Sequence, residues 1–430
     1  MLRIVNWQEL SLQEKQRCLA RPAQAKNIGN TIQTIVSTVR CHGDEALLNY
    51  TREFDGVSLS SLVVSQTQIE KATITDNAMN AMIDAIQTLT TYHQAIKPKP
   101  IGVKTAEGIS IERVYRPIAK VGLYVPGGHH TPLVSSLLMQ AIPALIAECP
   151  IRILCTPPNA QGGIDPHLLV AARLCQIETI YSIGGAQAIA AMAYGTETIP
   201  KVDKIFGPGN GYVTEAKAQV ALDPDGAAID MPAGPSEVMV VADKQANPEF
   251  IAADLLAQAE HGVDSQALLI CDSVHLAQAV NQAINRQLTQ LSRREMIIQS
   301  LKQSVIMVCN DRCEQLEIIN HYAPEHLMIN CEDADSWVKD IQSSGTVFLG
   351  QWAAETMGDY MTGSNHVLPT HGFARNYSGL GTGDFMKAIS IQSISEAGIR
   401  TLGASAHTLA LMEGLDAHAY AVKCRLEELT

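Results

Sequence analysis

The sequence lacks several features, and each absence removes a class of function from consideration. No block of Lys and Arg stands out, and the net charge is −13, so a nucleic-acid partner is not expected. No apolar run approaches the length needed to cross a bilayer, and the start lacks the basic-then-apolar pattern of a signal peptide. The chain is 46% hydrophobic and 17% charged and has no low-complexity tract, which indicates a globular protein.

The ten cysteines include no Cys-x-x-Cys pair. Cys309 and Cys313 come closest, but no neighbouring Cys or His pair completes a zinc-finger spacing. Scattered cysteines of this kind are most simply reduced, packed thiols of a cytosolic chain. We therefore expect a soluble, acidic, cytoplasmic protein without membrane or nucleic-acid partners.

What the sequence does contain is a repeated order of strand, turn and helix. Its 430 residues exceed what one core usually holds, so two or more domains are expected. The order strand, turn, helix, often with glycine in the turn, occurs four times between Val121 and Leu222, which predicts a parallel α/β sheet. A second α/β run extends from Glu237 to Leu349. We expect two α/β domains, the first inserted into the second.

The remaining segments frame these two runs. Residues 350–384 are rich in Gly, Ser, Thr and Asn, which favours a site-lining segment or a linker. The last forty or so residues look helical. Further helices are predicted over residues 1–20, about 27–54, about 66–95 and about 274–302.

Glu325 and His326 form the most reactive-looking pair in the chain. They follow Pro324 and precede the apolar run Leu327 to Ile329, so they are predicted at a loop-to-strand junction. Rigid scaffolds often present reactive groups at such junctions. A Glu can activate a water, and a His can move protons near neutral pH. Taken alone, a surface Glu beside a hydrogen-bonded His is the simpler interpretation.

Other polar residues are ambiguous when each is considered alone. Gln258 and His261 lie three apart on one predicted helix, a spacing that suits two metal ligands but also the polar edge of an amphipathic helix. Asp359 and His366 lie in the turn-rich segment and could be turn or capping residues. His418 would by default be a solvated helical histidine.

Three further features carry little weight alone. Gly207-Pro208-Gly209-Asn210-Gly211 follows a predicted strand but departs from the G-x-G-x-x-G fingerprint, so it is either a dinucleotide site or a tight turn. His129 and His130 could line the entrance of a cofactor-binding site, although a turn is the simpler interpretation. Cys155 ends a strand and could form a thiohemiacetal with an aldehyde, but no base lies near it in sequence.

Taken together, these stretches resemble one family, histidinol dehydrogenase, in motifs that occur in order over nearly the whole chain. The matching motifs are Val121 to Gly128, Gly184 to Ala190, Gly207 to Lys217, Asp230 to Glu237, Gln258 to Gln266, Tyr322 to Leu327, Gly358 to Pro369 and Gly379 to Phe385.

The resemblance implies a homodimeric zinc enzyme that oxidises L-histidinol to L-histidine in two steps with two NAD, at the end of histidine biosynthesis. It implies two related Rossmann-like α/β domains of aldehyde-dehydrogenase-like architecture, with short helical segments at both ends and a tail that crosses to the partner subunit. The implied boundaries are an N-terminal segment 1–20, a zinc domain 21–123 and 237–379, an NAD domain 124–236 and a tail 380–430.

The resemblance also assigns residues. Glu325 and His326 would be the catalytic pair, with His326 as the base and Glu325 activating water. The expected zinc ligands are Gln258, His261, Asp359 and His418. The expected substrate contacts are these four ligands with His326, Ser236, His366 and Glu413. The expected NAD contacts are Tyr124, Gln187 and Asn210. Two rival interpretations remain, a zinc hydrolase that uses Glu325 and an inactive α/β binding protein.

Overall fold

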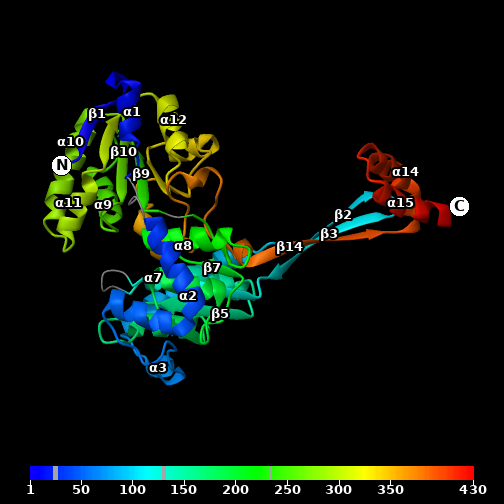
Figure 1. Cartoon of the computed structure of the whole chain (residues 1–430). Helices are drawn as coiled ribbons and strands as arrows, with labels where there is room; N and C mark the ends of the chain where they lie inside the picture. The colour runs from blue at the N-terminus through cyan, green and yellow to red at the C-terminus, as the bar shows by residue number, and fades with distance from the viewer. Residues whose placement is uncertain (23–27, 128–131, 233) are drawn as a thin grey trace.

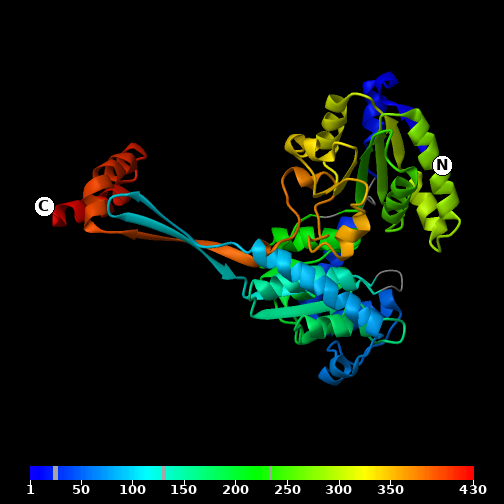
Figure 2. The ribbon, with the colours of Figure 1, turned by 180° about the vertical axis from the view of Figure 1, so that it is seen from behind.

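The computed structural model describes residues 1–22, 28–127, 132–232 and 234–430 and arranges them as two α/β domains and a projecting arm (Figure 1). We call the domains five-stranded and six-stranded after their sheets. Figure 2 shows from behind that the arm leads away from both domains and carries the C-terminus at its tip. The predicted fold class, two parallel α/β domains, is confirmed.

The five-stranded domain has a parallel sheet whose strand order is β6-β5-β4-β7-β8. Its strands are β4 (Lys120–Tyr124), β5 (Ile151–Thr156), β6 (Thr179–Ser182), β7 (Lys204–Phe206) and β8 (Ala228–Ile229). Its helices are α2 (Ile28–Tyr50), α3 (Gln66–Lys71), α4 (Asp76–Ala95), α5 (Val134–Ile146), α6 (Pro166–Leu174), α7 (Gly185–Tyr194) and α8 (Gly211–Leu222). Helices α2, α7 and α8 pack together over one core, and α3 to α6 pack over another. After β4 the chain adds β5 and β6 on one side of β4, and it then forms β7 on the other side. The strand order therefore reverses between β4 and β7.

The six-stranded domain has a parallel sheet of strand order β1-β11-β10-β9-β12-β13. Its strands are β1 (Arg3–Asn6), β9 (Glu237–Ala242), β10 (Gln266–Cys271), β11 (Val305–Val308), β12 (His326–Asn330) and β13 (Thr346–Leu349). Its helices are α1 (Leu12–Cys18), α9 (Pro248–Ala259), α10 (Val274–Leu288), α11 (Arg294–Leu301), α12 (Arg312–Tyr322) and α13 (Glu355–Tyr360), with 3-10 turns at Trp7–Glu9 and Ala334–Asp340. Strands β9 and β10 are buried along their whole length, as expected for central strands covered on both faces.

Local sequence explains where many helices begin. Asn247 precedes Pro248, and its side chain accepts a hydrogen bond from the Glu249 amide at the start of α9. An Asn cap followed by Pro is a strong helix start, because Pro has no amide hydrogen to leave unpaired. Asp165 and Pro166 begin α6 in the same way.

The arm is a three-stranded antiparallel sheet that ends in a helix pair. Its strands are β2 (Ile101–Ala106), β3 (Ile109–Pro117) and β14 (Met386–Ile394), and its helices are α14 (Glu396–Met412) and α15 (Asp416–Glu428). Residues far apart in sequence therefore meet in the arm, and β14 is exposed along most of its length.

The N-terminal segment differs from the helix predicted over 1–20. Residues Arg3 to Asn6 form β1, which pairs with β11 at the edge of the six-stranded sheet, and α1 covers only Leu12–Cys18. A four-residue strand is too short to show a period, and its pairing partner lies about three hundred residues later. The N-terminal segment thus belongs to the six-stranded domain.

The predicted domain boundary at residue 123 also differs from the structure. Helices α2 and α4 pack on the five-stranded domain, and β4 is its central strand, whereas the implied boundary places residues 21–123 in the other domain. An amphipathic helix shows which of its faces is buried, but not which sheet covers that face. The predicted helix 274–302 is two helices, α10 and α11, and 66–95 divides into α3 and α4 where Thr75 caps α4.

All ten cysteines are free, and Cys155 is among those that are buried. Across the described residues, no helix is both long enough and apolar enough to span a membrane.

Candidate active site

Glu325 and His326 lie at the junction predicted for them. Helix α12 ends at Tyr322, Ala323 adopts a left-handed conformation (φ 53°), and β12 begins at His326. This turn brings both side chains to the amino edge of the six-stranded sheet, where β9 also begins, with Glu237. The loop-to-strand prediction is confirmed.

The Glu325 carboxylate is held from one side. Its Oε2 atom accepts a hydrogen bond of 2.8 Å from the backbone amide of Glu237. Burial raises the pKa of Glu325 to about 8, although attraction to His326 opposes that increase. A buried carboxylate with a raised pKa is a stronger base than an exposed one, which suits the activation of a water.

The two nitrogens of His326 have different surroundings. Nδ1 lies 3.2 Å from the backbone oxygen of Glu237 and 3.2 Å from Oε1 of Glu355. Nε2 is buried without a hydrogen-bond partner and lies 3.6 Å from Oδ1 of Asp359. Because only acceptors surround Nδ1, Nδ1 is the nitrogen that keeps its proton when the imidazole is neutral, and the lone pair of that neutral form then lies on Nε2.

The carboxylates around His326 also control its charge. Burial alone would lower the pKa of His326, but Glu355, Glu325 and Asp359 outweigh it and raise the pKa to about 10. Burial in turn raises the pKa of Glu355 to about 8. This imidazole therefore binds a proton tightly in the ligand-free site, and the site as a whole attracts positive charge.

Three of the four expected metal ligands gather beside this pair. Gln258 lies in the last turn of α9, fully buried, and neither its amide oxygen nor its nitrogen has a hydrogen-bond partner. His261 lies just beyond the helix end and interacts electrostatically with Asp359, on α13, which packs against α9. An unpaired buried amide is costly, so a ligand for its oxygen is the natural explanation. Amide, imidazole and carboxylate donors together suit zinc.

Within the described chain, His, Cys, Asp and Glu side chains do not cluster in groups of three that could hold a metal by themselves. The set gathered here has only two such residues, His261 and Asp359, and the amide of Gln258. The expected fourth ligand, His418, lies on α15, which is at the far end of the arm (Figure 1). Glu413, between α14 and α15, is likewise remote, and both residues are exposed.

Two expected substrate contacts lie at the same edge. The Nδ1 atom of half-buried His366 lies 2.8 Å from the backbone oxygen of Asp359, and His366 also interacts electrostatically with His326. Burial lowers the pKa of His366, which favours its neutral form. Ser236 immediately precedes Glu237, the first residue of β9. One chain therefore brings these expected residues together but leaves the two on the arm, Glu413 and His418, away from them (Figure 1).

The expected cofactor residues lie at the carboxyl edge of the five-stranded sheet. Tyr124 ends β4, and its buried hydroxyl accepts a 3.0 Å hydrogen bond from the amide of Gly185 at the start of α7. Gln187 lies in the first turn of α7, and Asn210 caps α8 through the amides of Tyr212 and Val213. The strand order reverses between β4 and β7, where open α/β sheets bind ligands. His129 and His130 lie outside the described residues.

Comparison with known proteins decides the family. The family model of histidinol dehydrogenase matches residues 19–426. Histidinol dehydrogenases of Legionella pneumophila (strain Philadelphia 1) and Vibrio vulnificus (strain CMCP6) are 62% and 47% identical, over all of this chain and 100% and 99% of theirs. A crystal structure of histidinol dehydrogenase from Elizabethkingia anophelis has a TM-score of 0.95 at 43% identity, covering 100% of this chain and 98% of that chain. This chain belongs to the histidinol dehydrogenase family.

Membership of the histidinol dehydrogenase family makes the chain an oxidoreductase and confirms the resemblance read from its motifs. The Cys155 alternative does not fit this site. Its thiol is fully buried, and burial raises its pKa far above the ordinary value. A thiol of this kind is a poor nucleophile, because the thiolate is the reactive form.

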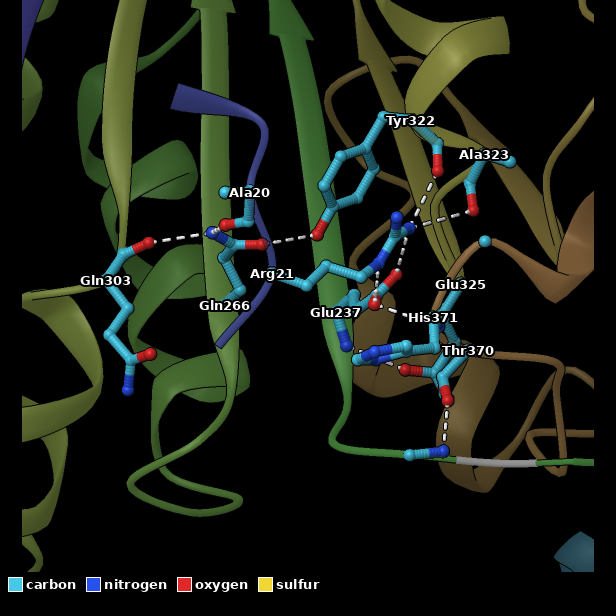
Figure 3. A network of polar contacts seen from close by, with 12 residues as sticks. Ala20, Arg21, Glu237, Gln266, Gln303, Tyr322, Ala323, Glu325, Thr370 and His371 are labelled. Atoms are coloured by element: carbon cyan, nitrogen blue, oxygen red, sulfur yellow. Dashed lines mark hydrogen bonds and ion pairs between the residues drawn. The ribbon is translucent and has the colours of Figure 1, made fainter. Parts of the chain in front are cut away.

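Two carboxylates of this candidate site, Glu355 and Glu237, were not expected from the sequence. Glu355 precedes Asp359 by four residues, a spacing that places both on one face of α13 and could have indicated it. Glu237 begins a strand that is otherwise apolar, which is an unusual place for a charge. Its carboxylate forms an ion pair with Arg21, and Figure 3 shows this pair directly beside Glu325.

Proposed function

We propose that this chain oxidises L-histidinol through L-histidinal to L-histidine, the last step of L-histidine biosynthesis, with zinc and two NAD per turnover. We also propose that it works in the cytoplasm as a homodimer whose subunits share each active site. The observation that carries the proposal is the arrangement of Glu325 and His326 beside the unpaired amide of Gln258, with His261 and Asp359 completing a partial ligand set.

Gln258, His261 and Asp359 would hold the zinc ion, joined by His418 from a second copy. When bound, the zinc holds and orients the substrate's imidazole and amine, and NAD accepts the hydride. Tyr124, Gln187 and Asn210 would contact NAD at the reversal of strand order in the five-stranded sheet. His366, Ser236 and Glu413 would complete the substrate contacts.

His326 serves as the base for the alcohol. Its Nε2 atom carries the free lone pair and faces the side of Asp359, where substrate is expected. The hydroxyl proton moves to Nε2 while the Nδ1 proton stays between the backbone oxygen of Glu237 and Glu355. Positive charge in the loaded site opposes the raised pKa of His326 and so frees Nε2 to accept a proton. The same carboxylates then stabilise the imidazolium.

Glu325 serves the second step, because only an aldehyde needs a water. One of its oxygens is occupied by the Glu237 amide, so the other is available to a water. Glu325 takes a proton from the water as the water oxygen bonds to the aldehyde carbon, and the imidazolium of His326 returns its proton to the carbonyl oxygen, which gives the neutral hydrate. The neutral His326 can then accept a hydroxyl proton of the hydrate during the second oxidation. The two neighbouring residues thus divide the work, and no cysteine is required.

The arm supports the homodimer. Large apolar residues stay exposed on it, among them Leu409, Leu411 and Met412 on α14 and Tyr420 on α15. Exposed apolar groups gathered on one small unit are typical of an interaction surface. Within one chain, Glu413 and His418 lie far from the candidate site. A second copy that covers these apolar residues would also place the arm's Glu413 and His418 at its own site.

The proposed reaction predicts a stoichiometry. Purified protein given L-histidinol and NAD should form two NADH for each L-histidine, because the aldehyde stays bound between the two oxidations. NADH can be followed at about 340 nm and histidine counted by chromatography. One NADH per turnover with release of free histidinal would contradict the two-step reaction, and turnover of an amide without NAD would favour a hydrolase.

The ligand assignment predicts a loss of zinc. His261→Ala and Asp359→Ala should each lose most of the bound zinc, since each removes one of few charged or imidazole donors. Elemental analysis after dialysis measures the zinc content, and His275→Ala, at an exposed position on α10, is the matched control. A variant that retains one zinc per chain shows that its residue is not a ligand.

A further inference from the structure

We infer that Arg21 and Glu237 are positioning residues for the catalytic pair, and that their ion pair fixes Glu325 and His326 where the chain crosses between the two domains. This inference rests on the proposed function for the roles of Glu325 and His326. Figure 3 shows the arrangement, with Arg21 between the start of β9 and the end of α12 and Glu325 directly beside them.

The backbone of Glu237 contacts both catalytic side chains. Its amide donates to Oε2 of Glu325 at 2.8 Å, and its carbonyl oxygen lies 3.2 Å from Nδ1 of His326. Both contacts come from one residue, so any rotation of its peptide units would move or release both groups. The geometry of the catalytic pair therefore depends on how firmly Glu237 is held.

The side chain of Glu237 is held by Arg21. Arg21 donates from Nε to Oε1 at 2.5 Å and from a terminal nitrogen to Oε2 at 2.9 Å, and the His371 amide adds a third bond to Oε1 at 2.9 Å. Only 3% of the Glu237 side chain and 14% of the Arg21 side chain are exposed. A two-point contact from a planar guanidinium fixes orientation as well as distance.

The same guanidinium also contacts the end of α12, which leads into Glu325 and His326. Arg21 donates to the backbone oxygen of Tyr322 at 2.7 Å and stacks 4.0 Å from the centre of its ring. The Tyr322 hydroxyl in turn donates to Oε1 of Gln266 at 2.7 Å. Tyr322 ends α12, only three residues before Glu325. Arg21 thus fixes both segments that present the catalytic pair.

These contacts lie where the chain passes between domains. Arg21 follows the segment that belongs to the six-stranded domain and precedes α2 of the five-stranded domain. The chain returns to the six-stranded domain between β8 and β9, and just before β9 the amide of Gly234 donates to the hydroxyl of Thr370. Thr370 and His371 lie between Val367 and Leu380, which pack in the core of the five-stranded domain. Arg21, the start of β9 and the segment of Thr370 and His371 therefore meet at Glu237.

The ion pair of Arg21 and Glu237 is better explained by the positioning of the catalytic residues than by a gain in the stability of the fold. Burying a salt bridge costs so much desolvation that apolar residues of similar size often serve stability equally well. A geometric role, in contrast, needs the two-point contact. Arg312 provides a comparison within the same domain, since it pairs with Asp333 at 2.9 Å and stacks over Trp337 at 4.4 Å without touching the catalytic pair.

The test compares Arg21→Ala, Arg21→Lys and the control Arg312→Ala in full-length, zinc-loaded protein. We expect Arg21→Ala to lower kcat for both histidinol and histidinal by about tenfold or more, because small displacements of reacting groups cost that much. KM for histidinol and the zinc content should stay near wild type, and Arg21→Lys should retain part of kcat. Arg312→Ala should change kcat little.

Chemical rescue separates placement from folding. Arg21 lines a surface pocket of about 570 Å³, so millimolar guanidinium should reach the vacated site and raise kcat of Arg21→Ala, but not of wild type or Arg312→Ala. Unchanged kcat in Arg21→Ala, or a loss that matches the fall in melting temperature and shows no rescue, overturns the inference. If Arg21→Ala does not fold, kcat of Arg21→Lys decides. A wild-type protein inactive on histidinol would reject the proposed function instead.

Discussion

Mixed dimers of Glu325→Gln and His418→Ala chains should regain activity that neither variant has alone. In such a dimer one site takes its catalytic pair from the His418→Ala chain and its arm residues from the Glu325→Gln chain, so nothing in that site is altered. The other site carries both defects. If random assembly makes half of the dimers mixed, the preparation should show about a quarter of wild-type activity, as two-fold symmetry requires.

The arm is the reason for expecting so large an effect. It places α14 and α15 far from α9 of the same chain, and Figure 1 and Figure 2 agree on this separation from opposite sides. His418 can then reach a site with Gln258 and His261 only if that site belongs to another copy.

The experiment has a sharp control. Glu325→Gln and His326→Ala chains carry their defects in the same part of the site, so their mixed dimers should stay inactive. Mixed dimers can be verified by purifying over two different tags. Verified Glu325→Gln/His418→Ala dimers that show no activity would mean that the arm serves its own chain.

The second large effect separates the two catalytic residues. His326→Ala should slow oxidation of both histidinol and histidinal, by roughly 10²- to 10⁴-fold, the usual cost of removing a general base. Glu325→Gln should slow histidinal oxidation by a similar factor and the first hydride transfer much less. The reason is geometric. Of the two residues, only His326 has a free nitrogen directed toward Asp359, where the alcohol is expected. Glu325 is needed only in the step in which water adds to the aldehyde.

Single-turnover measurements with histidinol and with added histidinal distinguish the two steps. Glu314→Gln is a suitable control, since Glu314 lies near the start of α12 and its contacts, Gln8 and Lys15, lie away from the site. Equal losses in both half-reactions of Glu325→Gln would refute the division of labour and indicate that Glu325 mainly supports His326.

The sequence predicted those parts of the site whose signal is local. Glu325 and His326 could be placed because Pro324 and the apolar run after them fix a loop-to-strand junction. The spacing of Gln258 and His261 likewise follows from helical geometry, although α9 ends before His261. Their interpretation as parts of one site depended on the order of the motifs along the chain, because each pair alone had a simpler interpretation.

What the sequence could not predict depends on pairing between distant segments. β1 is a strand only because β11 lies beside it, and Arg21 matters only because the fold brings it to Glu237. Strand β14 forms because it pairs with β3, and its apolar residues Ile389 and Ile391 stay exposed, so the strand has hardly any buried face that would mark it. Hydrophobic periodicity in a sequence arises where one face of a helix or strand is buried. The arm stands free of the two domains, so a strand such as β14 gives little signal of this kind.

The two sheets present opposite edges toward the candidate site, and that difference gives the two sides of the site opposite polarity. Helices α7 and α8 begin at the carboxyl edge of the five-stranded sheet, whereas α9 and α12 end at the amino edge of the six-stranded sheet. Each helix carries about half a positive charge at its start and half a negative charge at its end. One wall of the site therefore favours anions such as a dinucleotide's phosphates, and the other favours a metal ion and an ammonium group. In the proposed reaction, this backbone polarity alone disfavours an exchange of places between NAD and the substrate with its metal ion.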